Sequence, residues 1–268
     1  MRTNPSNLAL YILMFVIATS FLGACNTGTL EPEAVNLGWE YFPLETGRYI
    51  DYQVEDIQFS ILNPPDTNRY QIRELIGEEF ADINGDPSFR LERYRRANSN
   101  AAWVLDSVWQ IKRNTTRAIL LQNNRPLVKL VFPLEEGKEW KGTIFFKTES
   151  IDTLITPDTT INPQTQDTTI VNDTTIVIKD ISDTYKVVNF NKPLTLGTFS
   201  FDSTLTVIQK DDSTLVNIDR RKEIYAANVG LVYKDSTVAR YCDPSLCDFP
   251  VIEFGRKSRQ IIIGYGKL

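Results

Sequence analysis

The chain has 268 residues with 29 basic and 34 acidic side chains, a formal net charge of −5, and no histidine. This mildly acidic balance disfavours nucleic acid as a partner, because a phosphate backbone attracts basic surfaces. Without imidazole, the usual serine and cysteine catalytic triads are excluded, and so are histidine-ligated zinc, copper and iron sites. We therefore expect no metal and no cofactor, while chemistry that relies on paired carboxylates, as in glycoside hydrolysis, is still open.

The first 24 residues have the order of an export signal. Arg2 is the only charged residue before Glu31, and it precedes an uncharged stretch of 14 residues, 8–21. A helix that spans a bilayer needs about 20 apolar residues. A cleaved signal is therefore favoured over a transmembrane anchor.

The signal ends in Leu22-Gly23-Ala24-Cys25. This tetrapeptide resembles the lipobox of bacterial lipoproteins, in which small residues admit the chain to a peptidase and the cysteine thiol accepts a diacylglyceryl group. The resemblance implies cleavage before Cys25 and acylation with palmitate-like chains, which together make an effectively permanent membrane anchor. The alternative is an ordinary secretory signal followed by a chance cysteine.

Residues 25–37 are predicted to be the lipidated N-terminus and a flexible tether, because they are polar and show no hydrophobic periodicity. Asn26 stands where an aspartate retains the lipoproteins of enteric bacteria in the inner membrane, so the outer membrane is favoured. Whether the domain faces the periplasm or the cell surface is left open.

Residues 38–268 are predicted to form a single β domain. Alternating apolar and polar residues predict strands, and no segment keeps a helical period for more than about two turns. Residues 73–80 are the best helical candidate, and they also fit a strand with a bulge at Gly77. We expect an all-β, predominantly antiparallel curved sheet, built as an open half-barrel or a sandwich. The predicted strands are 50–55, 89–94, 103–111, 118–121, 127–132, 143–147, 185–190, 205–208, 215–218 and 260–264.

The segment FPLETGR at 42–48 recurs 90 residues later as FPLEEGK at 132–138. Two explanations stand side by side: a shared turn chemistry, or duplication of a half-domain. If the half-domain is duplicated, the strands that follow the two copies must occupy equivalent places in the sheet.

Residues 151–183 are dominated by Thr, Asp, Ile and Val and interrupt the rest of the domain. Such a segment could be disordered, since it lacks aromatic residues to anchor a core. A long exposed hairpin with its turn at Asn162-Pro163-Gln164 is favoured, because β-branched residues alternate on both sides of that turn.

Three Asp-Thr-Thr triplets in this insertion place Thr159, Thr168 and Thr174 directly after an aspartate. The triplet resembles the O-glycosylation motif of exported Bacteroidota proteins, in which the middle hydroxyl carries the glycan. The resemblance implies glycans on these three threonines. The alternative is a solvated, unmodified Thr-rich hairpin.

Cys242 and Cys247 are the only cysteines besides Cys25. An exported protein meets an oxidising compartment, so a local disulfide is predicted between them. Redox pairs usually have two intervening residues rather than four, and a metal site would need two further ligands nearby.

Two further motifs point to a family. Tyr41-Phe42-Pro43-Leu44, followed by Gly47, Tyr49 and Tyr52, resembles the FPLxxGxY start of many uncharacterised Bacteroidota outer-membrane lipoproteins. The run VGLVYK at 229–234 resembles a strand pair of the same proteins. The resemblance covers about 25 residues and implies a curved antiparallel sheet without an assigned activity.

Two classes of function fit the sequence. The first is a non-catalytic envelope lipoprotein that binds an envelope protein or a hydrophobic ligand, with a carrier-like half-barrel for lipids or lipoproteins as a variant. The second is a carboxylate-dependent hydrolase of envelope glycans with tryptophans lining its cleft. The first is favoured because no residues are singled out as catalytic, and large aromatics usually lie in β-domain cores. The tryptophans are Trp39, Trp103, Trp109 and Trp140.

Overall fold

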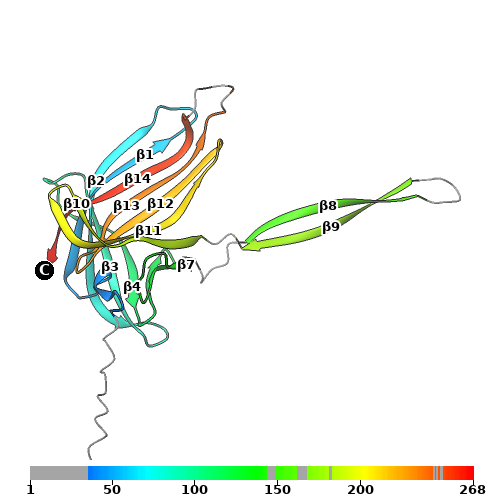
Figure 1. The fold of residues 1–268 in the computed structure, drawn as a ribbon. Coiled ribbons are helices and arrows are strands. Elements are labelled where there is room, and N and C mark those ends of the chain that lie inside the picture. Colours follow the sequence, from blue (N-terminus) through cyan, green and yellow to red (C-terminus); the bar gives the residue numbers. More distant parts are fainter. Residues whose placement is uncertain are drawn as a thin grey trace, which may run out of the picture. The chain divides into compact units, whose positions relative to one another are not determined.

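The computed structural model describes residues 36–143, 149–161, 168–180, 183–243, 245, 247 and 250–268. Apart from the single 3-10 turn η1 (Trp39–Tyr41), every regular element of these residues is a strand (Figure 1). The predicted all-β fold is confirmed. The strands are β1 (Arg48–Phe59), β2 (Asp66–Ala81), β3 (Pro87–Arg96), β4 (Val104–Arg113), β5 (Arg117–Gln122), β6 (Arg125–Val131), β7 (Glu139–Lys141), β8 (Glu149–Ile161), β9 (Thr168–Asp180), β10 (Thr184–Leu196), β11 (Phe199–Ser213), β12 (Asn217–Ala226), β13 (Gly230–Tyr241) and β14 (Ile252–Lys267).

Twelve of these strands form one antiparallel, nearly closed curved sheet in the order β6-β5-β4-β3-β2-β1-β14-β13-β12-β11-β10-β7. The pairing of β1 with β14 joins its two halves. The two ends of the sheet meet at Val128, whose N–H donates to the Gly142 carbonyl at 2.9 Å. The indole N–H of Trp140 also donates to the Val128 carbonyl at 2.9 Å. The curved sheet thereby surrounds an interior.

Each of the two FPLExG segments leads into the first strand of a six-stranded run of this sheet. One precedes the six-stranded meander β1 to β6, and the other precedes a second meander formed by β7 and β10 to β14. Gly47 and Gly137 both have a positive φ, of 88° and 79°, a conformation that glycine adopts without steric cost. Their N–H groups donate to Ile76 and Val187, each on the next strand of its own meander. The order of the two meanders agrees with a duplicated half-domain, but β1 lies in the middle of the sheet and β7 at its edge.

The insertion is a separate two-stranded sheet of β8 and β9, which pair from Glu149–Asp180 to Ile161–Thr168. The predicted long hairpin is confirmed. Its predicted turn lies outside the described residues. Thr159, Thr168 and Thr174 all lie on its strands.

Two details of the strand predictions were tested by the structure. Residues 73–80 lie within β2, and the register of β2 against β3 shifts between Ile76 and Glu79, so the bulge at Gly77 is confirmed. The strand predicted at 215–218 is wrong in its first half, because β12 begins at Asn217. The Thr214 hydroxyl accepts hydrogen bonds from the N–H groups of Val216 and Asn217, which holds the chain in a turn. The predicted strand 143–147 lies almost wholly outside the described residues.

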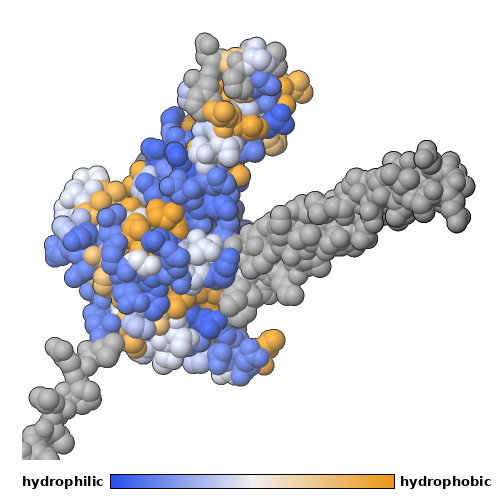
Figure 2. All heavy atoms as spheres, turned by 45° about the vertical axis from the view of Figure 1, so that its right-hand side comes forward, coloured by the Kyte–Doolittle hydropathy of each residue, from blue (hydrophilic) through white to orange (hydrophobic). Residues whose placement is uncertain are grey.

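Apolar side chains form two buried clusters inside the sheet, in keeping with the alternation of faces along a strand. The face seen in Figure 2 is largely hydrophilic.

The four tryptophans differ in burial: Trp140 is buried in the core, Trp103 and Trp109 are partly buried, and Trp39 is exposed. The core interpretation is therefore right for Trp140 and wrong for Trp39, whose ring lies instead against the guanidinium of Arg113.

Candidate functional site

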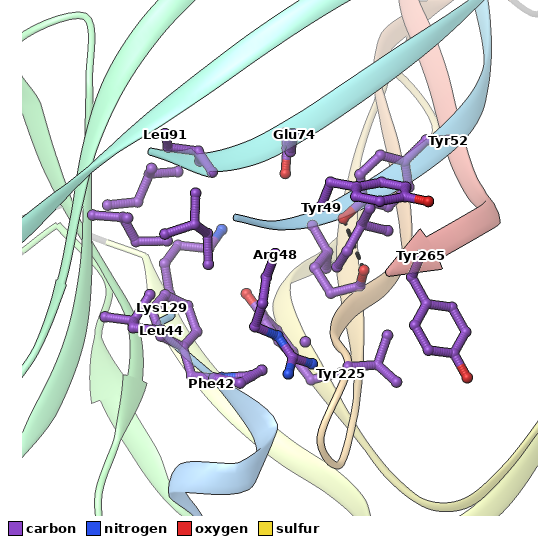
Figure 3. Close-up of a pocket in the computed structure, with 18 of the residues that line it drawn as sticks. Phe42, Leu44, Arg48, Tyr49, Tyr52, Glu74, Leu91, Lys129, Tyr225 and Tyr265 are labelled. Carbon is purple, nitrogen blue, oxygen red and sulfur yellow. Dashed lines mark hydrogen bonds between the residues drawn. The ribbon is translucent and has the colours of Figure 1, made fainter. Parts of the chain in front are cut away.

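A cavity of about 360 Å³ lies inside the curved sheet. Figure 3 shows Glu74 and Leu91 on one side of it and Phe42 and Leu44 on the other. Neighbouring strands supply its walls through alternate residues, which point to the same face. Much of the wall is apolar and is formed by Phe42, Leu44, Ile50, Ile76, Leu91, Ile111, Leu120 and Leu231.

A buried ion pair forms one part of the wall. The Lys129 ammonium on β6 lies 2.5 Å from Oε1 of Glu223 on β12, and the two side chains are 7% and 1% exposed. The Tyr225 hydroxyl donates to the other carboxylate oxygen of Glu223 at 2.6 Å. Lys234 lies 3.8 Å from Glu223. Each Glu223 oxygen therefore has a hydrogen-bond donor, which a buried carboxylate requires.

The surroundings of Glu223 keep it ionised. Burial raises the pKa of its carboxyl, but the charges of Lys129 and Lys234 and the hydrogen bonds from Lys129 and Tyr225 outweigh burial and bring the pKa to about 2. Burial, followed by the charge of Glu223, raises the pKa of Tyr225 well above its ordinary value. At neutral pH the tyrosine is a hydrogen-bond donor and the glutamate an acceptor.

A second ion pair lines the cavity between β2 and β3. Nε of Arg93 lies 3.1 Å from Oε1 of Glu74, and each side chain is 15% exposed. The Arg93 guanidinium also lies over the Trp109 ring, 4.0 Å from its centre, which adds a cation–π attraction. The Trp109 N–H is buried without a hydrogen-bond partner among the described residues.

These carboxylates do not form an acid–base pair for hydrolysis. A glycosidase needs one carboxyl whose pKa is raised so that it can protonate the leaving group. Glu223 has the opposite perturbation, and Glu74 is bound to an arginine. Glu223 is therefore not suited to act as a general acid at neutral pH.

Among the described residues, no three His, Cys, Asp or Glu side chains are grouped so that they could hold a metal ion. The described part of the chain also contains no helix with the length and apolar character needed to cross a membrane.

Both family motifs and one tryptophan singled out from the sequence contribute to the cavity wall, through Phe42, Leu44, Tyr49, Tyr52, Gly230, Leu231, Lys234 and Trp109. Cys25 is outside the described residues. Cys242 and Cys247 lie at disulfide-bonding distance, with Cα atoms 6.2 Å apart, and neither lines the cavity.

Sequence reasoning missed Lys129 and Glu223, which lie 94 residues apart. One local signal was present: Lys129 interrupts the otherwise apolar end of β6, where Val128, Lys129 and Leu130 are all buried.

No protein-family model and no curated protein match this chain. Two solved structures are similar to it. One is described as an exported protein with a YmcC-like fold from Bacteroides fragilis, at 10% identity and a TM-score of 0.35. The other is described as a lipoprotein from Parabacteroides distasonis, at 13% identity and a TM-score of 0.35. In each case the alignment covers 84% of this chain and 98% of the other.

Proposed function

We propose that this chain is a non-catalytic, membrane-anchored lipoprotein of the cell envelope whose curved sheet holds a hydrophobic ligand. The observation that carries the proposal is the cavity of about 360 Å³ with its largely apolar wall. Ligand sites are typically hollows of about 300–1,000 Å³ with apolar walls and a few placed polar groups. The buried Lys129–Glu223 pair and the Arg93–Glu74 pair are such polar groups.

The anchor is supported by the lipobox-like sequence that ends at Cys25. In this proposal residues 1–24 are removed, residues 25–37 tether the chain to the outer membrane, and residues 38–268 form the binding domain. The pairing of Cys242 with Cys247 fits the oxidising compartment that an exported protein enters. It also leaves Cys25 as the thiol available for acylation.

Intact-mass measurement of the protein from its native host tests the proposed modifications. We expect a chain that begins at Cys25 and carries acyl groups, with further glycan mass on Thr159, Thr168 and Thr174. Replacing Cys25 with serine should abolish the acyl mass, and replacing the three threonines with valine should abolish the glycan mass. The mass of an unmodified polypeptide from Cys25 onward would contradict both modifications.

Binding of a brominated alkyl probe in the cavity is expected to quench the fluorescence of Trp109, which lines the cavity. The full chain would be held in nanodiscs of zwitterionic lipid and titrated with bromoundecanol, a neutral alkyl probe whose bromine quenches indole on contact. We expect saturable quenching that empty nanodiscs do not show and that Trp109→Phe largely removes. Quenching that never saturates, or that Trp109→Phe leaves unchanged, would contradict the proposed function.

A variant that fills the cavity gives a second readout. Leu120 lines the cavity, and Leu120→Phe should weaken probe binding about tenfold or more, since small changes of volume in apolar pockets have effects of this order. Leu105 is exposed on β4 and does not line the cavity. Leu105→Phe is therefore the matched control and should leave binding unchanged.

A further inference from the structure

The cavity reverses the charge balance of the protein. The whole chain has a formal net charge of −5, yet the cavity is lined by five basic side chains and only two acidic ones. The basic residues are Arg48, Arg93, Lys129, Lys234 and Lys267, and the acidic residues are Glu74 and Glu223. An excess of positive charge in a hollow with apolar walls attracts anions, because low-dielectric walls focus the field.

The two acids are bound to basic partners in the deeper part of the cavity. Glu223 is paired with Lys129, and Glu74 with Arg93, and all four side chains are at most 15% exposed. Within each pair, the positive and the negative charge neutralise each other. They leave the remaining basic residues as the source of the excess charge.

The remaining three, Arg48, Lys234 and Lys267, form what we call the cationic rim. Their side chains are 27%, 42% and 54% exposed, so they lie closer to solvent than the buried pairs. Arg48 and Lys267 are directly opposite each other at the ends of β1 and β14. Like charges in opposite positions of a sheet are destabilising, and a single carboxylate, that of Glu45, offsets part of this by pairing with both.

One carboxylate pairs with the rim, but its single negative charge does not balance the three positive charges there. Glu45, which does not line the cavity, forms ion pairs with both Arg48 and Lys267. Arg48 also donates to the carbonyl of Asn228. Lys234 is 3.8 Å from Glu223, whose oxygen already accepts a hydrogen bond from Lys129 at 2.5 Å. The rim therefore keeps a positive charge that faces the cavity.

We propose that the ligand is a single-chain amphipathic anion, with its alkyl body against the apolar wall and its carboxylate or phosphate at the cationic rim. This ligand class rests on the proposed function and adds the charge of the head group to it. A charged head bound to ammonium and guanidinium groups forms charge-assisted hydrogen bonds, while the alkyl body gains from leaving water.

Three probes with the same chain and different head groups test this ligand class. The chain in zwitterionic nanodiscs would be titrated with bromoundecanoate, bromoundecanol and bromoundecyl-trimethylammonium, with Trp109 quenching as the readout. We expect the carboxylate to bind about tenfold more tightly than the alcohol, in line with the strength of hydrogen bonds to charged groups, and the ammonium to bind most weakly.

Neutralising the rim should remove this preference. In the double variant Lys234→Gln/Lys267→Gln, we expect the carboxylate and the alcohol to bind within about twofold of each other, since the charge-assisted contacts are lost. The double variant keeps the apolar wall and Trp109, so the alcohol should still give saturable quenching. Lys186→Gln is the matched control, because Lys186 is half-exposed and paired with Glu139 but does not line the cavity.

The outcomes separate the two proposals. Saturable quenching that is equally strong for all three probes would overturn the anionic ligand and leave the hydrophobic cavity function standing. A double variant that keeps the full carboxylate preference would overturn the role of the cationic rim. Absence of saturable quenching with every probe would overturn the proposed function itself.

Discussion

Replacing Glu223 with alanine is expected to lower the free energy of unfolding by about 3–5 kcal/mol, the usual effect of removing one member of a buried ion pair. The substitution leaves the Lys129 ammonium, 7% exposed, without its partner at 2.5 Å. It also leaves the buried Tyr225 hydroxyl without the acceptor that it contacts at 2.6 Å. Urea denaturation followed by circular dichroism measures the loss.

Two variants control this result. Replacing both Lys129 and Glu223 with methionine should recover most of the stability, because a buried ion pair can be exchanged for apolar side chains at little cost. Asp211→Ala removes a partner from the exposed Arg220–Asp211 pair and should change stability by less than about 1 kcal/mol. Equal effects of Glu223→Ala and Asp211→Ala would contradict a buried, uncompensated charge.

The carboxyl group of Glu223 also makes the stability of the fold depend on pH. Its pKa in the folded protein is about 2, below the value of about 4.3 that glutamate has in an unfolded chain. Its stabilising contribution is therefore fully present above pH ~4.3 and is lost as the pH falls from there toward 2. The loss amounts to about 3 kcal/mol. Glu223→Gln should show a correspondingly weaker fall in stability over this pH range.

Trp140→Ala is the second substitution with a large expected effect, about 3–5 kcal/mol, as for other buried aromatic residues. Trp140 is 9% exposed on β7 and packs edge-on against Tyr185, with ring centres 5.9 Å apart. Its indole N–H donates to Val128 on β6, at the opposite end of the sheet. The substitution therefore removes both core volume and a bond that brings the sheet ends together.

Conservative and exposed variants separate these two contributions. Trp140→Phe keeps most of the volume but leaves the Val128 carbonyl without its donor, and we expect a loss of about 1–3 kcal/mol. Trp39→Ala removes an exposed ring and should have little effect. In Trp140→Ala, backbone hydrogen exchange should be accelerated in β6 and β7 before other strands. Unchanged exchange there in Trp140→Ala would contradict a role in joining the sheet ends.

Local sequence patterns were sufficient for most of the fold. Alternation of apolar and polar residues marked β1, and Gly77 marked the bulge in β2, because the two faces of a strand meet different environments. The same alternation indicated the hairpin of β8 and β9. The prediction failed at Leu215 and Val216, where the hydroxyl of Thr214 bonds to the backbone and ends the alternation.

Local sequence patterns did not predict the cavity. A period of two residues shows which side chains share a face, but it does not show which distant strands face one another. Lys129 and Glu223 meet because the sheet curves until its ends touch, which brings β6, at one end, near β12, the fourth strand from the other end. Curvature and closure arise from the packing of the whole sheet, which no local segment encodes.

The sequence by itself indicated many of the strands, the hairpin, the repeated FPLExG entry and the lipobox-like motif at Cys25, since each depends on residues close together in the chain. Only the tertiary structure decided that the two meanders enclose a cavity and that a buried ion pair and a cationic rim line it. The physical reason is that burial and charge pairing depend on distance in space, which the folded sheet sets.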